Sequence, residues 1–315
     1  MKAFYSSLFP LNLPPDHRFP MRKYSRLREL LLAEGSLELH EAPPVAHEDL
    51  LRVHDPEYVR RVEAGELSAR ELRRLGFPWS PELVARAFAS VGASLAAARA
   101  ALTDGFGANL AGGTHHADRD SGSGYCVFND FAVTAAALLA HRQAERVLIL
   151  DLDVHQGNGT ARLMAGLPGV FTCSLHGRDN FPYRKERSDL DVELPTGTGD
   201  EAYLAALDGA LSVVRQRFGR PDIVLYLAGA DPHEADRFGK LRLTTAGLAR
   251  RDARVFEELA PEVPVAVAMG GGYGRDLETV ARIHSTTITL GAAAFRAPSA
   301  APAAPPSAPA PAGRS

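Results

Sequence analysis

Two carboxylates and an imidazole alternate with apolar residues near the middle of the chain, in the stretch ILDLDVHQGNGT (residues 149–160). Alternate side chains of an extended strand share a face, so Asp151, Asp153 and His155 are predicted to project to one side. Buried charges of this kind need compensation, and a bound metal ion is the simplest source of it. Carboxylate oxygen and neutral imidazole nitrogen both suit Zn²⁺. The alternative is a strand end whose Asp residues cap a neighbouring helix.

A third carboxylate, Asp231, follows the apolar run DIVLYLA (residues 222–228) in a glycine-containing loop. On its own such a residue is more typical of a turn, but beside Asp153 and His155 it is the expected third ligand. Three protein ligands leave positions open for water and substrate, which is the arrangement of a catalytic zinc site. His233 and Asp236 are close in sequence and are weaker candidates.

Acid–base chemistry is predicted for His115 and His116, which are adjacent in the glycine-containing segment AGGTHHADRDSGSGYCVFND (residues 111–130). The pKa of an imidazole lies near the pH at which most enzymes work. The alternative is a pair of ordinary loop histidines.

Tyr273 lies in the glycine-rich run MGGGYGRD (residues 269–276), after the last predicted strand. Its hydroxyl could hydrogen-bond an oxyanion that develops beside a metal. A phosphate-binding loop is disfavoured, because the GxGxxG spacing and the Lys-Ser/Thr pair of a P-loop are both missing.

The elements that must position these residues alternate along the chain. Strands are predicted over residues 146–154, 170–175, 222–228 and 263–269. Helices are predicted over residues 24–33, 81–102 and 130–143, and near 200–218 and 245–260. This alternation predicts an α/β fold with a single doubly wound, mostly parallel sheet flanked by helices. Ligands bind at the carboxyl ends of the strands in such a sheet, where the candidate residues lie.

Composition excludes several classes of function. The chain has 315 residues, 45% of them hydrophobic, and a formal net charge of -3. Lys and Arg are scattered among acidic residues, which argues against a nucleic-acid partner. The N-terminus is broken by prolines, and no stretch approaches the roughly 18 unbroken apolar residues of a membrane span. We therefore expect a cytoplasmic protein with no membrane partner. Residues 1–295 are expected to form one domain, and the Pro/Ala-rich residues 296–315 a disordered tail.

The motifs GGTHHA, GYCVFND, DLDVHQGNGT, AGADP and GGGYG follow one another in this order. In this set and order the chain resembles the histone deacetylase superfamily, the zinc-dependent branch of the arginase–deacetylase fold. The sequence motif DVHQGNG is most similar to class IV members and to bacterial histone deacetylase-like and acetoin-utilisation-type deacetylases. The segments HRFPMRKY (residues 17–24) and VHDPEYV (residues 53–59) extend the resemblance towards the N-terminus.

The resemblance implies an activity and its cofactors. The expected enzyme is a zinc-dependent amidohydrolase that uses metal-activated water to remove an acyl group, above all acetyl, from Nε-acyl-lysine or a related small acylated amine. One Zn²⁺ per chain would be held by Asp153, His155 and Asp231. A structural monovalent cation, usually K⁺, would be held by Asp151 and Ser174, with backbone carbonyls near Leu175, Asp153 and His155.

The same resemblance implies roles for the remaining residues. His116 matches the general base, His115 its partner, and Tyr273 the group that polarises the scissile carbonyl. Asp151 matches the carboxylate that supports His115, and Asn158 stands where many members carry an Asp that supports the second histidine. The walls of the acyl-lysine tunnel match Gly124, Tyr125 and, more loosely, Phe181.

Two departures from the family pattern bear on chemistry and substrate. A neutral amide at Asn158 stabilises an imidazolium less well than a carboxylate does, so a lower pKa is expected for His116. The segment RLGFPWSPE (residues 74–82) contains no Asp where several peptide deacetylases place one, which leaves peptide recognition open.

Several alternatives remain at this point. The enzyme could hydrolyse acetylpolyamines or long-chain acyl-lysine. It could be a ureohydrolase of the same fold with two Mn²⁺ ions, or a non-catalytic acyl-lysine-binding protein. The sequence does not give the oligomeric state.

Overall fold

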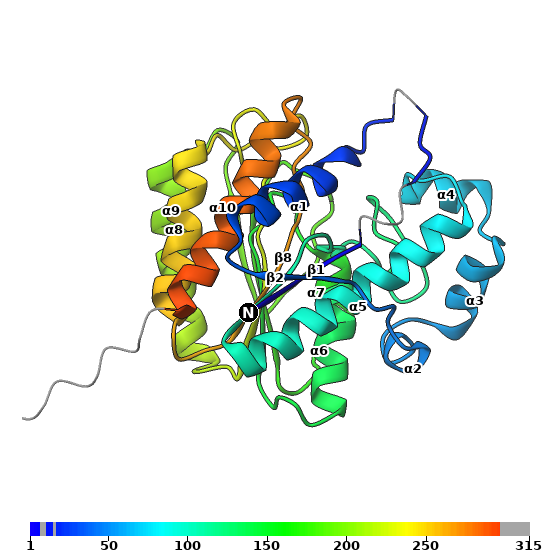
Figure 1. Cartoon of the computed structure of the whole chain (residues 1–315), viewed down its shortest axis with the longest axis horizontal. Coiled ribbons are helices and arrows are strands. Elements are labelled where there is room, and N and C mark those ends of the chain that lie inside the picture. Colours follow the sequence, from blue (N-terminus) through cyan, green and yellow to red (C-terminus); the bar gives the residue numbers. More distant parts are fainter. Residues whose placement is uncertain (7–10, 15–16, 297–315) are drawn as a thin grey trace, which may run out of the picture.

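The computed structural model describes residues 1–6, 11–14 and 17–296. Within them, eight strands form one all-parallel sheet in the order β2-β1-β3-β8-β7-β4-β5-β6. This confirms the predicted α/β fold (Figure 1). The strands span β1 Lys2–Tyr5, β2 Glu38–Glu41, β3 Phe106–Asn109, β4 Val147–Asp151, β5 Val170–Gly177, β6 Leu190–Leu194, β7 Ile223–Leu227 and β8 Val265–Ala268.

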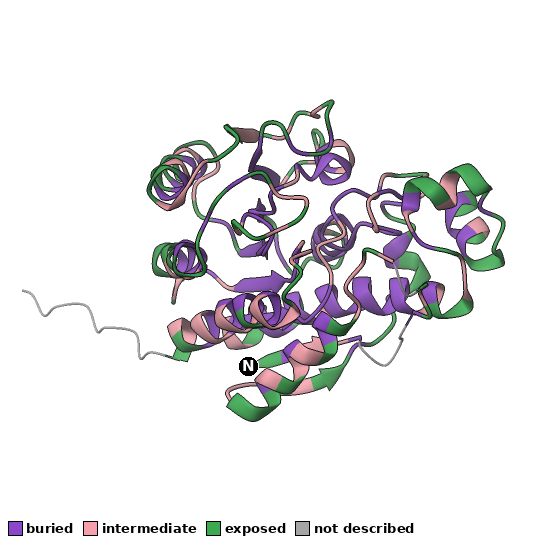
Figure 2. Cartoon of the chain, turned by 90° about the horizontal axis from the view of Figure 1, so that it is seen from above, coloured by how far each residue is buried: buried purple, intermediate pink, exposed green. Residues whose placement is uncertain are grey.

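Helices cover both faces of the sheet, as expected for a doubly wound topology. Alternate residues of the central strands point into two different apolar clusters: Leu148 and Leu150 of β4 pack with α1, α8, α9 and α10, whereas Val147 and Ile149 pack with α3, α5 and α6. Buried residues accordingly line the sheet and the inner sides of the helices (Figure 2). The helices span α1 Arg22–Glu34, α2 His47–Leu50, α3 Pro56–Ala64, α4 Ala69–Leu75, α5 Pro81–Asp104, α6 Asp130–Ala140, α7 Asn158–Met164, α8 Asp200–Arg217, α9 Thr245–Leu259 and α10 Leu277–Arg296.

The strand predicted over residues 146–154 is shorter than expected. β4 ends at Asp151, so Asp153 and His155 lie in the loop that follows it rather than in the strand. The turn is stabilised by the aspartate side chains themselves, because Asp151 Oδ1 accepts the backbone N–H of Asp153 at 3.1 Å and Asp153 Oδ1 accepts that of His155 at 2.9 Å. Side-chain hydrogen bonds of this kind compete with sheet pairing.

The order of strands places a topological switch point between β4 and β7. The chain leaves β4 towards β5 on one side, whereas it leaves β7 towards β8 on the other. In open parallel sheets the loops at such a point diverge and leave a crevice beyond the carboxyl ends of the strands. The loops after β4 and β7 carry the three predicted metal ligands.

One helix among the described residues, α5, is long and apolar enough by length and composition to cross a membrane. Its most apolar window has a mean hydropathy of 1.2, and 78% of that window is buried inside the structure. Burial of this extent is typical of a core helix.

The expected tail over residues 296–315 lies outside the described residues, except for Arg296, which ends α10.

Candidate metal centre and active site

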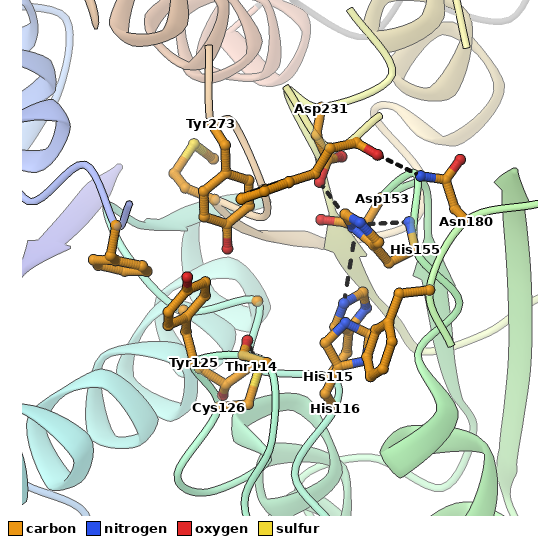
Figure 3. A pocket seen from close by; sticks show the side chains of 18 of the residues that line it. Thr114, His115, His116, Tyr125, Cys126, Asp153, His155, Asn180, Asp231 and Tyr273 are labelled. Atoms are coloured by element: carbon orange, nitrogen blue, oxygen red, sulfur yellow. Dashed lines mark hydrogen bonds and ion pairs between the residues drawn. The ribbon is translucent and has the colours of Figure 1, made fainter. Parts of the chain in front are cut away.

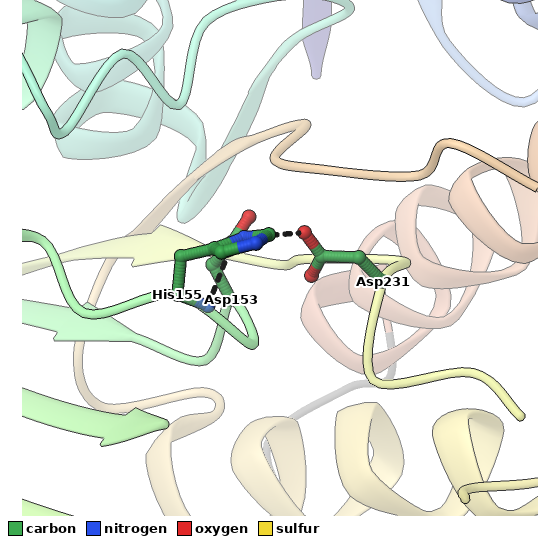
Figure 4. A group of neighbouring side chains, drawn as sticks. All are labelled: Asp153, His155 and Asp231. Atoms are coloured by element: carbon green, nitrogen blue, oxygen red, sulfur yellow. Dashed lines mark hydrogen bonds and ion pairs between the residues drawn. The ribbon is translucent and has the colours of Figure 1, made fainter. Parts of the chain in front are cut away.

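Three side chains from the ends of two neighbouring strands meet at the switch point. Asp153 and His155 follow β4, and Asp231 follows β7. The Nδ1 atom of His155 lies 2.9 Å from Asp153 Oδ1 and 3.2 Å from Asp231 Oδ2, and one donor atom from each residue lies within 4.8 Å of the others (Figure 4). Donors held about 2.0–2.1 Å from a tetrahedral zinc are roughly 3.3 Å apart. The spacing therefore fits a single divalent ion.

Backbone groups hold these carboxylates in place. The N–H of Val154 donates to Asp231 Oδ1 at 2.9 Å, so the loop after β4 fixes the ligand of the loop after β7. The glycine-rich run after β8 closes over the same group. A Cβ on Gly271 would lie 2.0 Å from Asp231 Oδ2, and the φ of Gly271 is +53°. Only glycine fits here, because both the contact and the backbone conformation exclude a side chain.

The charges of the three residues are strongly coupled. Burial acts to lower the pKa of His155, but its hydrogen bonds to Asp153 and Asp231 raise that pKa to about 10. Burial and the nearby Asp153 raise the pKa of Asp231 to about 7. Without an ion the cluster therefore balances its charge by holding protons on His155 and Asp231. A divalent cation would displace these protons and supply the positive charge in their place.

The two adjacent histidines after β3 lie beside this cluster in contrasting environments. His115 Nδ1 is 2.7 Å from Asp151 Oδ2, and His116 Nδ1 is 2.7 Å from Asn158 Oδ1. Burial acts to lower the pKa of His115, but the charges of Asp151 and Asp153 raise it to about 9. Burial, and then the charges of the neighbouring histidines, hold the pKa of His116 well below its usual value. The pair therefore combines a charged imidazole with a neutral one, which can accept a proton.

Tyr273 is fixed through its own backbone. Its N–H donates to Asp236 Oδ2 at 2.6 Å, and its carbonyl accepts from Arg237 Nε at 2.8 Å. Figure 3 shows its ring facing the histidines and the metal-ligand cluster across the pocket. Burial holds the pKa of the phenol well above its usual value, so the hydroxyl keeps its proton and remains a donor.

The structure separates the two weaker candidates from the cluster of ligands. Asp236 holds the backbone of Tyr273, and its second oxygen accepts the N–H groups of Phe238 and Gly239 at 2.8 and 2.9 Å. His233 lies 3.1 Å from Thr245 Oγ1 and accepts the N–H of Ala235. Neither residue belongs to the Asp153–His155–Asp231 group.

A cavity of about 270 Å³ joins these groups, and all three predicted wall residues line it. The ring of Phe181 lies 5.0 Å from that of His116, and Tyr125 lies 5.9 Å from Tyr273. A Cβ on Gly124 would lie 2.7 Å from His116 Cδ2, so this glycine allows the wall to approach the histidine closely. The segment 74–82 lies behind this wall, since the N–H of Tyr125 donates to the carbonyl of Leu75.

The sequence matches the histone deacetylase domain family over residues 17–289. The chain belongs to the histone deacetylase family. It is 33% identical over 270 residues to a histone deacetylase-like amidohydrolase of Pseudomonas aeruginosa, covering 79% of this chain and 70% of the relative. It is 30% identical over 304 residues to histone deacetylase 2 of Arabidopsis thaliana, covering 91% and 78%. It is also 42% identical over 277 residues to an uncharacterized protein of Picosynechococcus sp., covering 87% and 92%.

This histone deacetylase-family amidohydrolase therefore has a candidate Asp-His-Asp metal site in the cavity that the histidine pair and Tyr273 line. The structure brings together every residue predicted for the metal, the histidine pair, Tyr273 and the wall. The second cation site remains a prediction. Asp151 and Ser174 are opposite each other in register on β4 and β5, and Ser174 Oγ lies 2.9 Å from His176 Nδ1. Leu175 would contribute its backbone carbonyl, so its side chain can pack in the apolar core.

Two residues of this site make contacts that sequence reasoning did not predict. Lys23 of α1 is 2% exposed, lines the cavity and donates to the backbone carbonyls of Gly271 and Gly272. It lies within HRFPMRKY, a segment that the family resemblance includes without assigning a role to Lys23. Asp236 had been considered only as a ligand, because its position near Asp231 says nothing about the backbone of a loop some 37 residues away.

Proposed function

We propose that this protein is a zinc-dependent deacylase that hydrolyses the amide bond of Nε-acyl-lysine or a related acylated amine, with acetyl as the principal acyl group. The observation that carries the proposal is the convergence of three groups on one cavity: the Asp153–His155–Asp231 cluster, the histidine pair and the Tyr273 hydroxyl. Membership of the histone deacetylase family supports acylated amines as the substrate class.

We assign zinc to this site because imidazole and carboxylate both suit Zn²⁺ and three protein ligands leave a position open for water and substrate. When bound, the ion supplies Lewis acidity to a carbonyl oxygen and lowers the pKa of water to about 7.

The side chains around the cavity supply the proton transfers. His116 is neutral because its pKa is depressed, so its free ring nitrogen takes a proton from the water that attacks the amide carbon. The resulting imidazolium lies beside the cationic His115, which makes it a strong acid. It therefore returns the proton to the departing amine as the C–N bond breaks. The neutral Tyr273 phenol donates a hydrogen bond to the carbonyl oxygen as negative charge builds there.

The other functions considered from the sequence have less support. A ureohydrolase with two Mn²⁺ ions needs additional bridging carboxylates, but only one group of three potential ligands occurs among the residues that the structure describes. Asn158 presents an amide oxygen to His116 and is not part of that group. An acyl-lysine-binding protein without catalysis would not need a base and an oxyanion donor placed together.

The test is turnover of a fluorogenic acetyl-lysine amide by the purified protein, with and without a chelator and after zinc is restored. We expect the chelator to stop turnover and zinc to restore it. Turnover that persists without metal would contradict the proposal.

A His116→Ala variant tests the base. We expect kcat to fall by about 10²–10⁴-fold while zinc remains bound, because general acid–base catalysis contributes about that factor. His47→Ala is the matched control, since His47 is an exposed histidine that does not line the cavity. A panel of acetyl-lysine, longer acyl-lysine and acetylpolyamine substrates then defines the acyl group and the amine.

A further inference from the structure

The side chain of Arg251 on α9 is fully buried beneath the metal-ligand loops. It is 0% exposed and is the largest fully buried side chain among the described residues. Its Nη1 atom donates to the backbone carbonyl of Gly229 at 2.6 Å and lies 3.4 Å from that of Leu152. One guanidinium nitrogen therefore spans the segments that follow β7 and β4.

These two carbonyls belong to the loops that carry all three candidate ligands. Leu152 directly precedes Asp153, and Gly229 lies two residues before Asp231. The loops touch closely, since a Cβ on Gly229 would lie 2.5 Å from the Cα of Asp153. A change in the position of either carbonyl therefore changes the distance between Asp153 and Asp231.

A buried charge is a costly way to fill a core, so its retention needs a reason. Asp252 neutralises the guanidinium, accepting a hydrogen bond from Arg251 Nε at 2.8 Å, and is itself held by the hydroxyls of Tyr226 and Thr287. Apolar residues of similar volume often replace such a pair with little loss of stability. Arg251 Nη2 also has no partner among the described residues. Packing alone therefore does not account for the pair, whereas the bonds to the two carbonyls do.

We propose that Arg251 is a positioning residue of the metal centre: it joins the backbones of the two ligand-bearing loops from behind and sets the separation of Asp153 and Asp231. Asp252 stabilises the buried guanidinium by supplying the opposite charge. The inference rests on the metal site of the proposed function, but not on hydrolysis.

Two variants test this role. Arg251→Lys keeps a cation beside Asp252, but its single shorter-reaching nitrogen cannot serve Asp252 and both carbonyls. The double variant Arg251→Met with Asp252→Asn removes both charges and keeps the volume. Arg250→Met is the matched control, because Arg250 is the preceding residue on α9 and is 53% exposed beside Glu201. Where the double variant does not fold, the lysine variant decides.

The readouts are the zinc Kd, from competition with a chromogenic chelator, and the visible absorption of the Co²⁺-substituted protein, which reports ligand geometry. We expect Arg251→Lys to weaken zinc binding by about 10–100-fold, the range typical of groups that orient metal ligands, and to change the Co²⁺ spectrum. Arg250→Met should leave both unchanged. Wild-type zinc affinity and an unchanged spectrum in Arg251→Lys, with or without a loss of thermal stability, would overturn the inference.

This outcome is separate from that of the proposed function. A wild-type protein that binds zinc tightly but releases no acyl group contradicts the proposed hydrolysis and leaves the role of Arg251 intact. An Arg251→Lys variant with wild-type zinc affinity contradicts the role of Arg251 and leaves the proposed hydrolysis intact.

Discussion

Gly271 offers the sharpest test of the metal centre, because one added methyl group would strike a candidate ligand. The Cβ of an alanine would lie 2.0 Å from Asp231 Oδ2 and 2.2 Å from its Cγ. An ordinary contact of about 3.4 Å requires the carboxylate to retreat by roughly 1.4 Å. Metal sites tolerate errors of only about 0.2 Å in ligand distance. Asp231 therefore cannot hold the ion in the variant.

The expected loss has two parts. An alanine at the positive φ of +53° destabilises the fold by about 1–2 kcal/mol, whether or not metal is bound. Loss of one of three ligands should in addition weaken zinc binding by at least about 100-fold, or about 2.7 kcal/mol.

Gly166→Ala separates the two parts. Gly166 has a φ of +70° with nothing within 4 Å of an added Cβ, so Gly166→Ala destabilises the backbone without a steric clash. Thermal unfolding of the metal-free proteins should fall in both variants, but a chelator competition should show weaker zinc binding in Gly271→Ala alone. The reasoning fails if Gly271→Ala binds zinc within about threefold of the wild type, a difference of less than about 1 kcal/mol.

Three further predictions concern the groups around the ion. Tyr273→Phe should lower kcat by about 10²–10³-fold at unchanged zinc affinity, because it removes a hydrogen-bond donor to the oxyanion. A wild-type kcat in this variant would show that Tyr273 is not that donor. Asn158→Asp should move the acid limb of the profile of kcat/KM against pH to higher pH: a carboxylate stabilises imidazolium, raises the pKa of His116 and leaves less neutral base at a given acid pH. Acid limbs that superimpose in the wild type and in Asn158→Asp would contradict this effect on the pKa of His116. Asp236→Ala should lower kcat by freeing the Tyr273 backbone. In a double variant with Tyr273→Phe it should lower kcat little further, because both changes act through the Tyr273 hydroxyl. Additive losses of kcat would show that Asp236 has an independent role.

The sequence was sufficient to predict the central part of the fold and the composition of the site. The strands β4, β5, β7 and β8 are apolar runs, and the polar residues that follow them gather at one sheet edge in any parallel arrangement. Four strands, β1, β2, β3 and β6, were not predicted. Each is only four or five residues long, and the largely exposed β2 (ELHE) and the partly exposed β6 (LDVEL) lack the apolar pattern of a central strand.

The end of β4 shows a different limit. Alternation correctly placed Leu150, Leu152 and Val154 in one apolar cluster, opposite the acidic side chains, but could not locate where sheet pairing stops. That point depends on side-chain hydrogen bonds from Asp151 and Asp153 to nearby N–H groups.

Contacts to backbone atoms of distant loops were also beyond sequence reasoning. Asp236 and Arg251 act on carbonyls and N–H groups, which every residue has, so no pattern of residue types identifies their partners.

The placement of the ligands at a topological switch point has a consequence for how the protein acquires its ion. Asp153 and His155 are neighbours in the chain, but Asp231 joins them only when β7 has docked against β4. Before that contact forms, the site offers only the Asp153–His155 pair, so an ion bound there would not nucleate the fold in the way it does in a zinc finger. Loading of the proposed ion would then be a late event on the folded chain, and its binding free energy would add to the stability of the native state.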